Sequence, residues 1–194
     1  QGAGWAADNN ANGGGDISLT GGSLRTAGAN APGIVQSLGT ITATGPLAIA
    51  TTGATSAGVA LSGSGSLSLG ETRISTATDG SAGLRIVGTA AQGATLTLNG
   101  PLIIETQGTG SSGILAVHNT ANAVMVPVGS SILTHGDNAR GMDLQAPEGN
   151  LGNWNVAAGT RTETRGAQAS GVYLGSKDGA VNVAVAADVV TTGA

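Results

Sequence analysis

The stretch Ile104-Glu-Thr-Gln-Gly-Thr-Gly-Ser-Ser-Gly-Ile114 decides the fold, because its pattern returns along the whole chain. The pattern is Thr-x-Gly, four residues, and then Gly followed by a hydrophobic residue. In one copy Thr78 replaces the first Gly, and the last copy stops at its first Gly, Gly193. The copies begin at Thr26, Thr51, Thr76, Thr106, Thr134, Thr164 and Thr191. A spacing of 25 to 30 residues predicts a repeat protein.

Each copy contains three short segments in which residues alternate in polarity, which is the pattern of half-buried strands. The first segment ends at the repeat threonine, the second follows the second Gly, and pairs such as Leu67 and Leu69 mark the third. Gly, Asn, Asp, Ser and Pro separate the segments and favour sharp corners. We therefore predict an all-β fold, a right-handed single-stranded parallel β-helix of six or seven coils of about 27 residues. The β-helix is expected over residues 17–194, after an irregular segment at 1–16.

The repeat threonine has the same parity as the apolar residue two positions before it, so we expect it to point inward. Threonines of successive coils would then form a structural ladder, with hydroxyls bonded to one another or to the backbone. Thr162 is an exception to the apolar pattern two positions before the threonine. The Gly two positions after the threonine is expected to supply a positive φ at the corner.

The composition limits the classes of function. The chain has 9% charged and 2% aromatic residues, 35 Gly, no Cys and a formal net charge of −4. Its basic residues are scattered and few aromatics accompany them, which argues against nucleic-acid binding. No apolar run approaches the length of a membrane-spanning helix, so we expect no membrane insertion by this segment. Without cysteine, disulfides and thiolate metal sites are excluded.

Three motifs resemble sites of known chemistry, but each lacks a required feature. Gly108–Gly113 matches GxGxxG, yet a strand-like segment follows where a phosphate-binding helix is needed. Gly13-Gly-Gly15-Asp16 is similar to a calcium-binding nonapeptide, yet no tandem array of nine-residue repeats follows. His118 and His135 lack a spacing suited to zinc. We predict no cofactor, no metal site and no catalytic residue.

Two sets of outward-pointing residues are candidates for a function. Glu105 and Glu163 each precede a repeat threonine, so they share a face two coils apart with Leu133 between them, a separation of about 10 Å. That distance is marginal for a glycosidase pair, and a solvated face is the expectation. The third segments present small hydroxyl residues, which could order water or face glycans, at Thr40, Thr42, Ser66, Ser68, Thr95 and Thr97.

The least repetitive part of the chain runs from Thr134 to Trp154. Loops inserted into solenoids are common sites of partner binding. We therefore predict a partner-contact loop at His135, Asp137, Asn138, Arg140 and Glu148. Its partner would be a host surface protein, a glycan or a second copy of the chain, and the alternative is a solvated loop without function.

The coils, of which 104–114 is typical, resemble those of pertactin-type passengers of bacterial autotransporters. The resemblance covers 17–194 and depends on the style of the repeat, the few charges, the absence of cysteine and the abundance of Gly, Ala, Thr and Ser. It implies export through an outer-membrane barrel and display on, or release from, a Gram-negative bacterium, as an adhesive, virulence-associated stalk without catalysis.

The Arg-Gly-Asp tripeptide of some relatives is missing, and Arg140-Gly-Met-Asp143 does not replace it. Two alternatives stay open: a carbohydrate-active β-helix enzyme, either a lyase or a hydrolase, and a haemagglutinin-like β-helix of two-partner secretion. The chain opens without a signal peptide and stops inside a repeat, so we expect it to be a fragment of a longer passenger.

Overall fold

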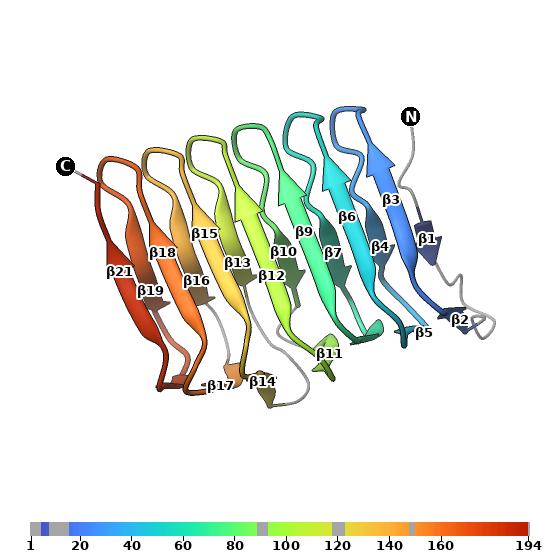
Figure 1. Ribbon diagram of the computed structural model, residues 1–194. Coiled ribbons are helices and arrows are strands. Elements are labelled where there is room, and N and C mark those ends of the chain that lie inside the picture. The colour runs from blue at the N-terminus through green and yellow to red at the C-terminus, as the bar shows by residue number, and fades with distance from the viewer. Residues whose placement is uncertain (1–4, 8–15, 89–92, 118–122, 148–149, 194) are drawn as a thin grey trace.

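The computed structural model describes residues 5–7, 16–88, 93–117, 123–147 and 150–193. These residues form a parallel β-solenoid of about six turns, without a helix in the described part. Figure 1 shows the turns stacked along one axis, with the two ends of the chain at opposite ends of the stack. Each turn contributes strands to three faces. The predicted β-helix architecture is therefore confirmed.

The ladder sheet is the face whose strands end at the repeat threonines. Its strands, in spatial order, are β3 (Gly22–Thr26), β6 (Leu47–Thr51), β9 (Thr72–Thr76), β12 (Leu102–Thr106), β15 (Ser131–Thr134), β18 (Arg161–Thr164) and β21 (Asp188–Thr191). A corner follows each of the first six threonines. The second sheet comes after it, with β1 (Trp5–Ala7), β4 (Ile34–Gln36), β7 (Val59–Ser62), β10 (Leu84–Val87), β13 (Ser112–Val117), β16 (Arg140–Ala146) and β19 (Ser170–Ser176).

The third face is divided into two sheets. Its first sheet contains β2 (Ile17–Leu19), β5 (Thr40–Ala43), β8 (Ser66–Leu69) and β11 (Thr95–Leu98). Its second contains β14 (Val124–Val126), β17 (Leu151–Val156) and β20 (Val181–Val185). All of the pairings are parallel, as required of a chain that winds in one direction.

One strand lies where the sequence predicted irregular structure. β1 falls within the segment 1–16 and pairs in register with β4, Trp5 with Ile34. Its three residues are too few to show an alternating pattern, so their pairing comes from the neighbouring turn rather than from local propensity.

The core consists of aliphatic side chains stacked from turn to turn. Leu67, for example, lies between Ile41 and Leu96 in register, and all three are fully buried. Each such side chain contributes about 1.5–3 kcal/mol on burial. On the other two faces, Leu174 and Val189 of the last turn are 52% and 44% exposed, whereas their register partners in the preceding turn, Leu144 and Thr162, are buried. Stability therefore depends on the neighbouring turn, as in other solenoids.

The seven repeat threonines lie in register along the ladder sheet, each opposite the next. Their exposure follows the stack: Thr51 to Thr164 are buried, whereas Thr26 is half-buried and Thr191 is exposed. In the first three turns each hydroxyl donates to the carbonyl oxygen five residues later. The bonds run from Thr26 to Ala31 (2.6 Å), from Thr51 to Ser56 (2.8 Å) and from Thr76 to Ser81 (2.9 Å).

Serines at the same corner position of successive turns explain why only the early turns make the bond from the threonine hydroxyl to the carbonyl oxygen. The N–H of Ser56 donates to Ser81 Oγ of the next turn, and the N–H of Ser81 donates to Ser111 Oγ, each over 3.1 Å. The next turn has Ala139 at this position, so the N–H of Ser111 closes a local turn instead. From there on the hydroxyls of Thr106, Thr134 and Thr164 have no hydrogen-bond partner among the described residues.

The Gly two positions after each threonine has a different role from the one predicted. The positive φ lies two residues further on, for example at Asn30 (53°), Gly110 (64°) and Asn138 (54°), and not at Gly28 or Gly108. At Gly108 a Cβ would instead overlap the backbone of Thr78 in the preceding turn. This glycine permits close backbone stacking between corners, so the prediction of a positive φ there was wrong.

The second Gly of the repeat forms a socket for the next turn. A Cβ on Gly83 would overlap the Cγ2 methyl of Ile104, which is the inward residue two positions before the next threonine. Gly58 and Gly113 have the same relation to Ile74 and Ile132. The pairing explains why this inward position prefers a β-branched residue, because only β-branching puts a methyl group there.

Thr162 occupies this inward position in one turn, and we expect Thr162→Val to stabilise the fold. The methyl group of Thr162 fills the socket at Gly141, but its buried hydroxyl has no partner among the described residues. Valine keeps the methyl group and removes the unpaired hydroxyl, so the free energy of unfolding should rise by about 1 kcal/mol. Thermal and urea denaturation measure the change.

Thr76→Val is the matched control, because the buried hydroxyl of Thr76 donates to Ser81. Loss of the Thr76 hydroxyl removes the hydrogen bond to the Ser81 carbonyl oxygen. Thr76→Val should therefore be less stable than the wild type by about 1 kcal/mol. A shift of both variants in the same direction would contradict the assignment of the two hydroxyls.

Candidate interaction surface

The predicted contact residue His135 lies beside the ladder sheet. Its Nε2 is 3.1 Å from Glu105 Oε1 of the preceding turn. Gln107 donates to the same oxygen over 2.8 Å. Half of the Glu105 side chain is exposed, so the three residues form a small polar cluster at the surface.

Asp137 and Asn138 take part in the stacking of corners. Asp137 Oδ1 accepts a 2.8 Å hydrogen bond from the N–H of Ala167, and Asn138 donates its own N–H to the Ala167 carbonyl. Asn138 adopts the left-handed conformation, which asparagine tolerates better than most residues. The carbonyl of Asp137 accepts in turn from Gly110 in the preceding corner. Asp137 therefore connects three successive turns, and Asn138 adds a second bond to the later of them.

Arg140 belongs to a different cluster, on the second sheet. It donates to Asp143 Oδ2 over 2.8 Å, and its guanidinium stacks 3.7 Å from the centre of the Tyr173 ring. Gln145 donates to the other oxygen of Asp143, which is only 5% exposed. The positive charge of Arg140 therefore balances the nearly buried carboxylate of Asp143. Glu148, the fifth predicted residue, lies outside the described residues.

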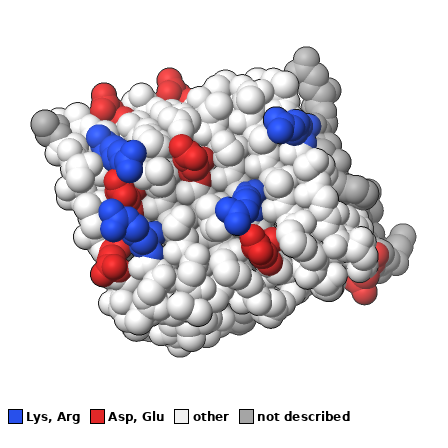
Figure 2. Space-filling view, in the orientation of Figure 1, with Lys and Arg blue, Asp and Glu red and all other residues white. Residues whose placement is uncertain are grey.

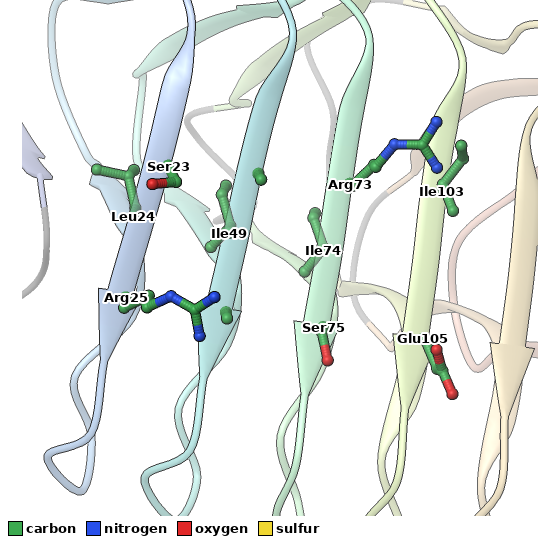
Figure 3. Close-up of a pocket in the computed structure, with 11 residues that line it drawn as sticks. Ser23, Leu24, Arg25, Ile49, Arg73, Ile74, Ser75, Ile103 and Glu105 are labelled. Carbon is green, nitrogen blue, oxygen red and sulfur yellow. The ribbon is translucent and has the colours of Figure 1, made fainter.

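The four described residues of the predicted loop thus have partners inside the molecule and lie on different faces. The structure instead places a groove on the outward side of the ladder sheet, over β3, β6, β9 and β12 (Figure 3). Its volume is about 310 Å³. The floor consists of Ala48, Ala50 and Ser75, and the long side chains of Arg25, Arg73 and Glu105 surround it.

The groove was not predicted from the sequence because, at the position before each repeat threonine, only the acidic residues were compared between turns. The signal becomes visible when the position before each threonine is compared across turns: Arg25, Ala50, Ser75 and Glu105 stand opposite one another in register. Two small residues between two long ones leave a depression between turns stacked about 4.8 Å apart.

The ladder face carries few charges, and Figure 2 shows most of them grouped with a charge of opposite sign. Glu163 lies between Arg165 (2.6 Å) and Arg161 (2.9 Å). The hydrogen bonds from Arg165 and then from Arg161 hold the pKa of Glu163 below its ordinary value.

Glu105 and Glu163 lie on one face two turns apart with Leu133 between them in register, as the sequence predicted. A carboxylate with a lowered pKa is a poor general acid at neutral pH.

The two arginines around Glu163 predict a pH dependence of stability. Because the pKa is lowered on folding, the ionised Glu163 stabilises the fold above its unfolded-state pKa, and this contribution is lost as the pH falls through the folded-state value. Glu163→Gln should therefore lower the melting temperature at pH 7, and this effect should diminish as the pH falls below the ordinary pKa of glutamate, about 4.3. Melting curves of both proteins between pH 3 and pH 7 measure the difference.

Glu71→Gln is the control for this series, since Glu71 has one exposed ion pair, with Arg73, where Glu163 has two. Its effect at pH 7 should be smaller. A difference between wild type and Glu163→Gln that stays constant from pH 3 to pH 7 would rule out the ion pairs as its cause.

Metal sites and membrane-spanning helices are two further classes of feature. The described residues contain no group of three or more His, Asp or Glu placed to hold a metal ion. In the same part of the chain no helix is long and apolar enough to cross a membrane.

Comparison of the chain with protein-family models, with curated proteins and with solved structures gives no significant match. What is established is therefore a parallel β-solenoid of about six turns, without assignment to a family.

Proposed function

We propose that this chain is part of the passenger of a bacterial autotransporter, and that it acts at the cell surface as an adhesive stalk without catalysis. The observation that carries the proposal is the solenoid itself, in which about six similar turns stack into a rod with a continuous outward face. A rod of this kind can present a binding surface away from the cell.

The distribution of the acids supports adhesion over catalysis. Glu71, Asp143 and Glu163 are each bonded to arginine, and Glu105 is bonded to His135. The two acids on the ladder face that could form a glycosidase pair are separated by Leu133, and one has a lowered pKa. Glycoside hydrolysis requires one carboxyl group that stays protonated, which means a raised pKa.

The low content of charged residues and the absence of cysteine support the proposal of an autotransporter passenger. With 9% charged residues and no cysteine, the chain gains its stability from stacked aliphatics and backbone ladders rather than from disulfides. A chain without disulfides can cross an outer membrane unfolded and fold turn by turn outside. We infer export and surface display on a Gram-negative bacterium from this combination.

Surface display is tested by adding protease to intact producing cells. We expect the chain to be digested while a periplasmic marker stays intact, and protection of the chain would contradict the proposed location. Adhesion is tested with beads that carry the native chain or the same chain unfolded by heat. Only the native chain should retain beads on host cells.

Catalysis is tested by incubating the chain with a panel of polysaccharides. We expect no turnover. Turnover that disappears in Glu105→Gln or Glu163→Gln would favour the carbohydrate-active enzyme and overturn the non-catalytic stalk.

A further inference from the structure

We propose that the groove on the ladder sheet binds an acidic glycan, through the carboxylate of one sugar residue. This proposal extends the adhesive function above, and rests on it for its biological use, by naming the class of ligand. The argument depends on three properties of the groove: its small floor, one cation without an acidic partner, and a row of hydrogen-bonding groups beside that cation.

The floor of the groove is formed by small side chains. Ala48 and Ala50 on β6 and Ser75 on β9 leave an open groove of about 310 Å³ between longer side chains. This volume lies at the lower end of the range for small-molecule sites. The methyl groups of the two alanines provide an apolar surface for the C–H face of a sugar ring.

Arg25 supplies the cation. Among the described residues it forms no ion pair and no side-chain hydrogen bond, whereas Arg73 is paired with Glu71 at 2.9 Å. Figure 3 shows the Arg25 side chain extending from β3 across β6, over the floor of the groove. A guanidinium in this position can bind a carboxylate with two parallel hydrogen bonds. The chain has a net charge of −4, so attraction of an anion depends on this local cation and not on the whole molecule.

Ser75 and Glu105 continue the row that begins at Arg25. The four residues Arg25, Ala50, Ser75 and Glu105 are opposite one another in register, so the Cα atoms of the first and last are about 14 Å apart. Gln107 and His135 both contact Glu105 Oε1, and no described residue donates to Oε2. The Ser75 hydroxyl and this oxygen therefore remain able to bond the hydroxyl groups of a glycan in which the carboxylate of one sugar residue lies at Arg25.

The backbone of the groove favours a glycan over a peptide. β6 and β9 lie inside a parallel sheet and are paired on both sides, so their N–H and C=O groups are used between turns. An extended peptide binds a sheet by adding a strand at a free edge. In the ladder sheet β3 is an end strand, but the floor of the groove lies on β6 and β9, which have no free edge. A ligand on this floor must be recognised by side chains, which here are a guanidinium, a hydroxyl and a carboxylate.

The test is calorimetric titration of the folded chain with three probes. Tetragalacturonate and sialyllactose carry a sugar carboxylate from two different sources, and a neutral galactose tetramer lacks it. We expect at least one acidic probe to bind and the neutral probe to bind at least tenfold more weakly. Which acidic probe binds more tightly identifies the source of the glycan.

Arg25→Gln should weaken binding of the acidic probe at least tenfold, and Arg25→Lys should weaken it less. The matched control is Arg85→Gln on β10 of the second sheet, because Arg85 also forms no ion pair among the described residues. It removes the same charge far from the groove and should leave binding unchanged. Melting curves establish that each variant is folded.

No binding of either acidic probe, equal binding of the neutral probe, or equal loss in Arg25→Gln and Arg85→Gln would each overturn the proposal. These results are separate from the test of adhesion. If wild-type beads adhere to host cells and the probes fail, the adhesive function stands and the ligand class is wrong. If the probes bind and beads do not adhere, the groove stands and the adhesive function is wrong.

Discussion

Replacing Gly108 with alanine is expected to lower the free energy of unfolding by about 3 kcal/mol, the upper end of the usual cost of overpacking. The Cβ would overlap the carbonyl carbon and oxygen of Thr78 and the nitrogen of Asp79 in the preceding turn. All of these are backbone atoms within the stack, so relief requires two turns to move apart. Movement at one corner also weakens the strand pairing of β12 with β9, and we expect the melting temperature to fall by roughly 10 °C.

Gly110 provides the control within the same corner. A Cβ there meets no atom within 4 Å, although its φ is +64°. Gly110→Ala should therefore cost only about 1–2 kcal/mol, for the left-handed conformation alone. Chemical denaturation of both variants measures the two costs. The close-stacking role of Gly108 fails if Gly110→Ala proves the more destabilising of the pair.

The contrast between these two glycines shows how far the sequence could predict the corners. The recurrence of Thr-x-Gly revealed that the corner repeats, but not why the Gly is needed there. The left-handed position two residues later holds Asn30, Thr55, Gly80, Gly110, Asn138 and Gln168 in successive turns. No single residue type marks that position, so a reading based on glycine placed the positive φ at the wrong site.

The core was predictable because one physical rule governs it. Alternation along a strand specifies which side chains point inward, and a regular repeat superposes them, so pairs such as Leu67 and Leu96 follow from spacing alone. The partners of inward hydroxyls did not follow. Thr76 has an acceptor where the next turn has a serine, Ser111, and Thr106 has none where the next turn has an alanine, Ala139. The hydrophobic pattern of the sequence does not mark this corner position.

The candidate site was harder to predict than the core. His135 and Arg140 were selected because their segment departs from the repeat, yet the structure places them in separate clusters with partners of their own. The groove depends on side-chain size at outward positions of four different turns. Its residues, such as Ala50 and Ser75, attract no attention singly, and only the register of the sheet brings them together.

The second large effect is expected at the socket of Gly83, where Gly83→Ala should destabilise the fold by about 3 kcal/mol. The new Cβ would overlap the Cγ2 methyl of Ile104 and come within 2.7 Å of the Gly113 carbonyl oxygen. Unlike at Gly108, the main obstacle is one methyl group of a side chain. The effect should therefore depend on the residue at position 104, which can be varied independently.

Ile104→Ala removes the Cγ2 methyl and by itself should cost about 2–5 kcal/mol through lost burial and a cavity. The double variant Gly83→Ala, Ile104→Ala should be more stable than the sum of the single effects predicts, by at least about 1 kcal/mol, because the added methyl group occupies space that the lost one vacated. Ile104→Val is the control, since valine retains a methyl group at the Cγ2 position and should leave the two costs nearly additive. Additivity in both cycles would mean that the Gly113 carbonyl, and not the side chain of the next turn, determines the need for glycine. Coupling that appears only with alanine would show that sequence positions 21 residues apart are selected as a pair, so the regular spacing of the repeat is maintained by contacts between turns as well as within them.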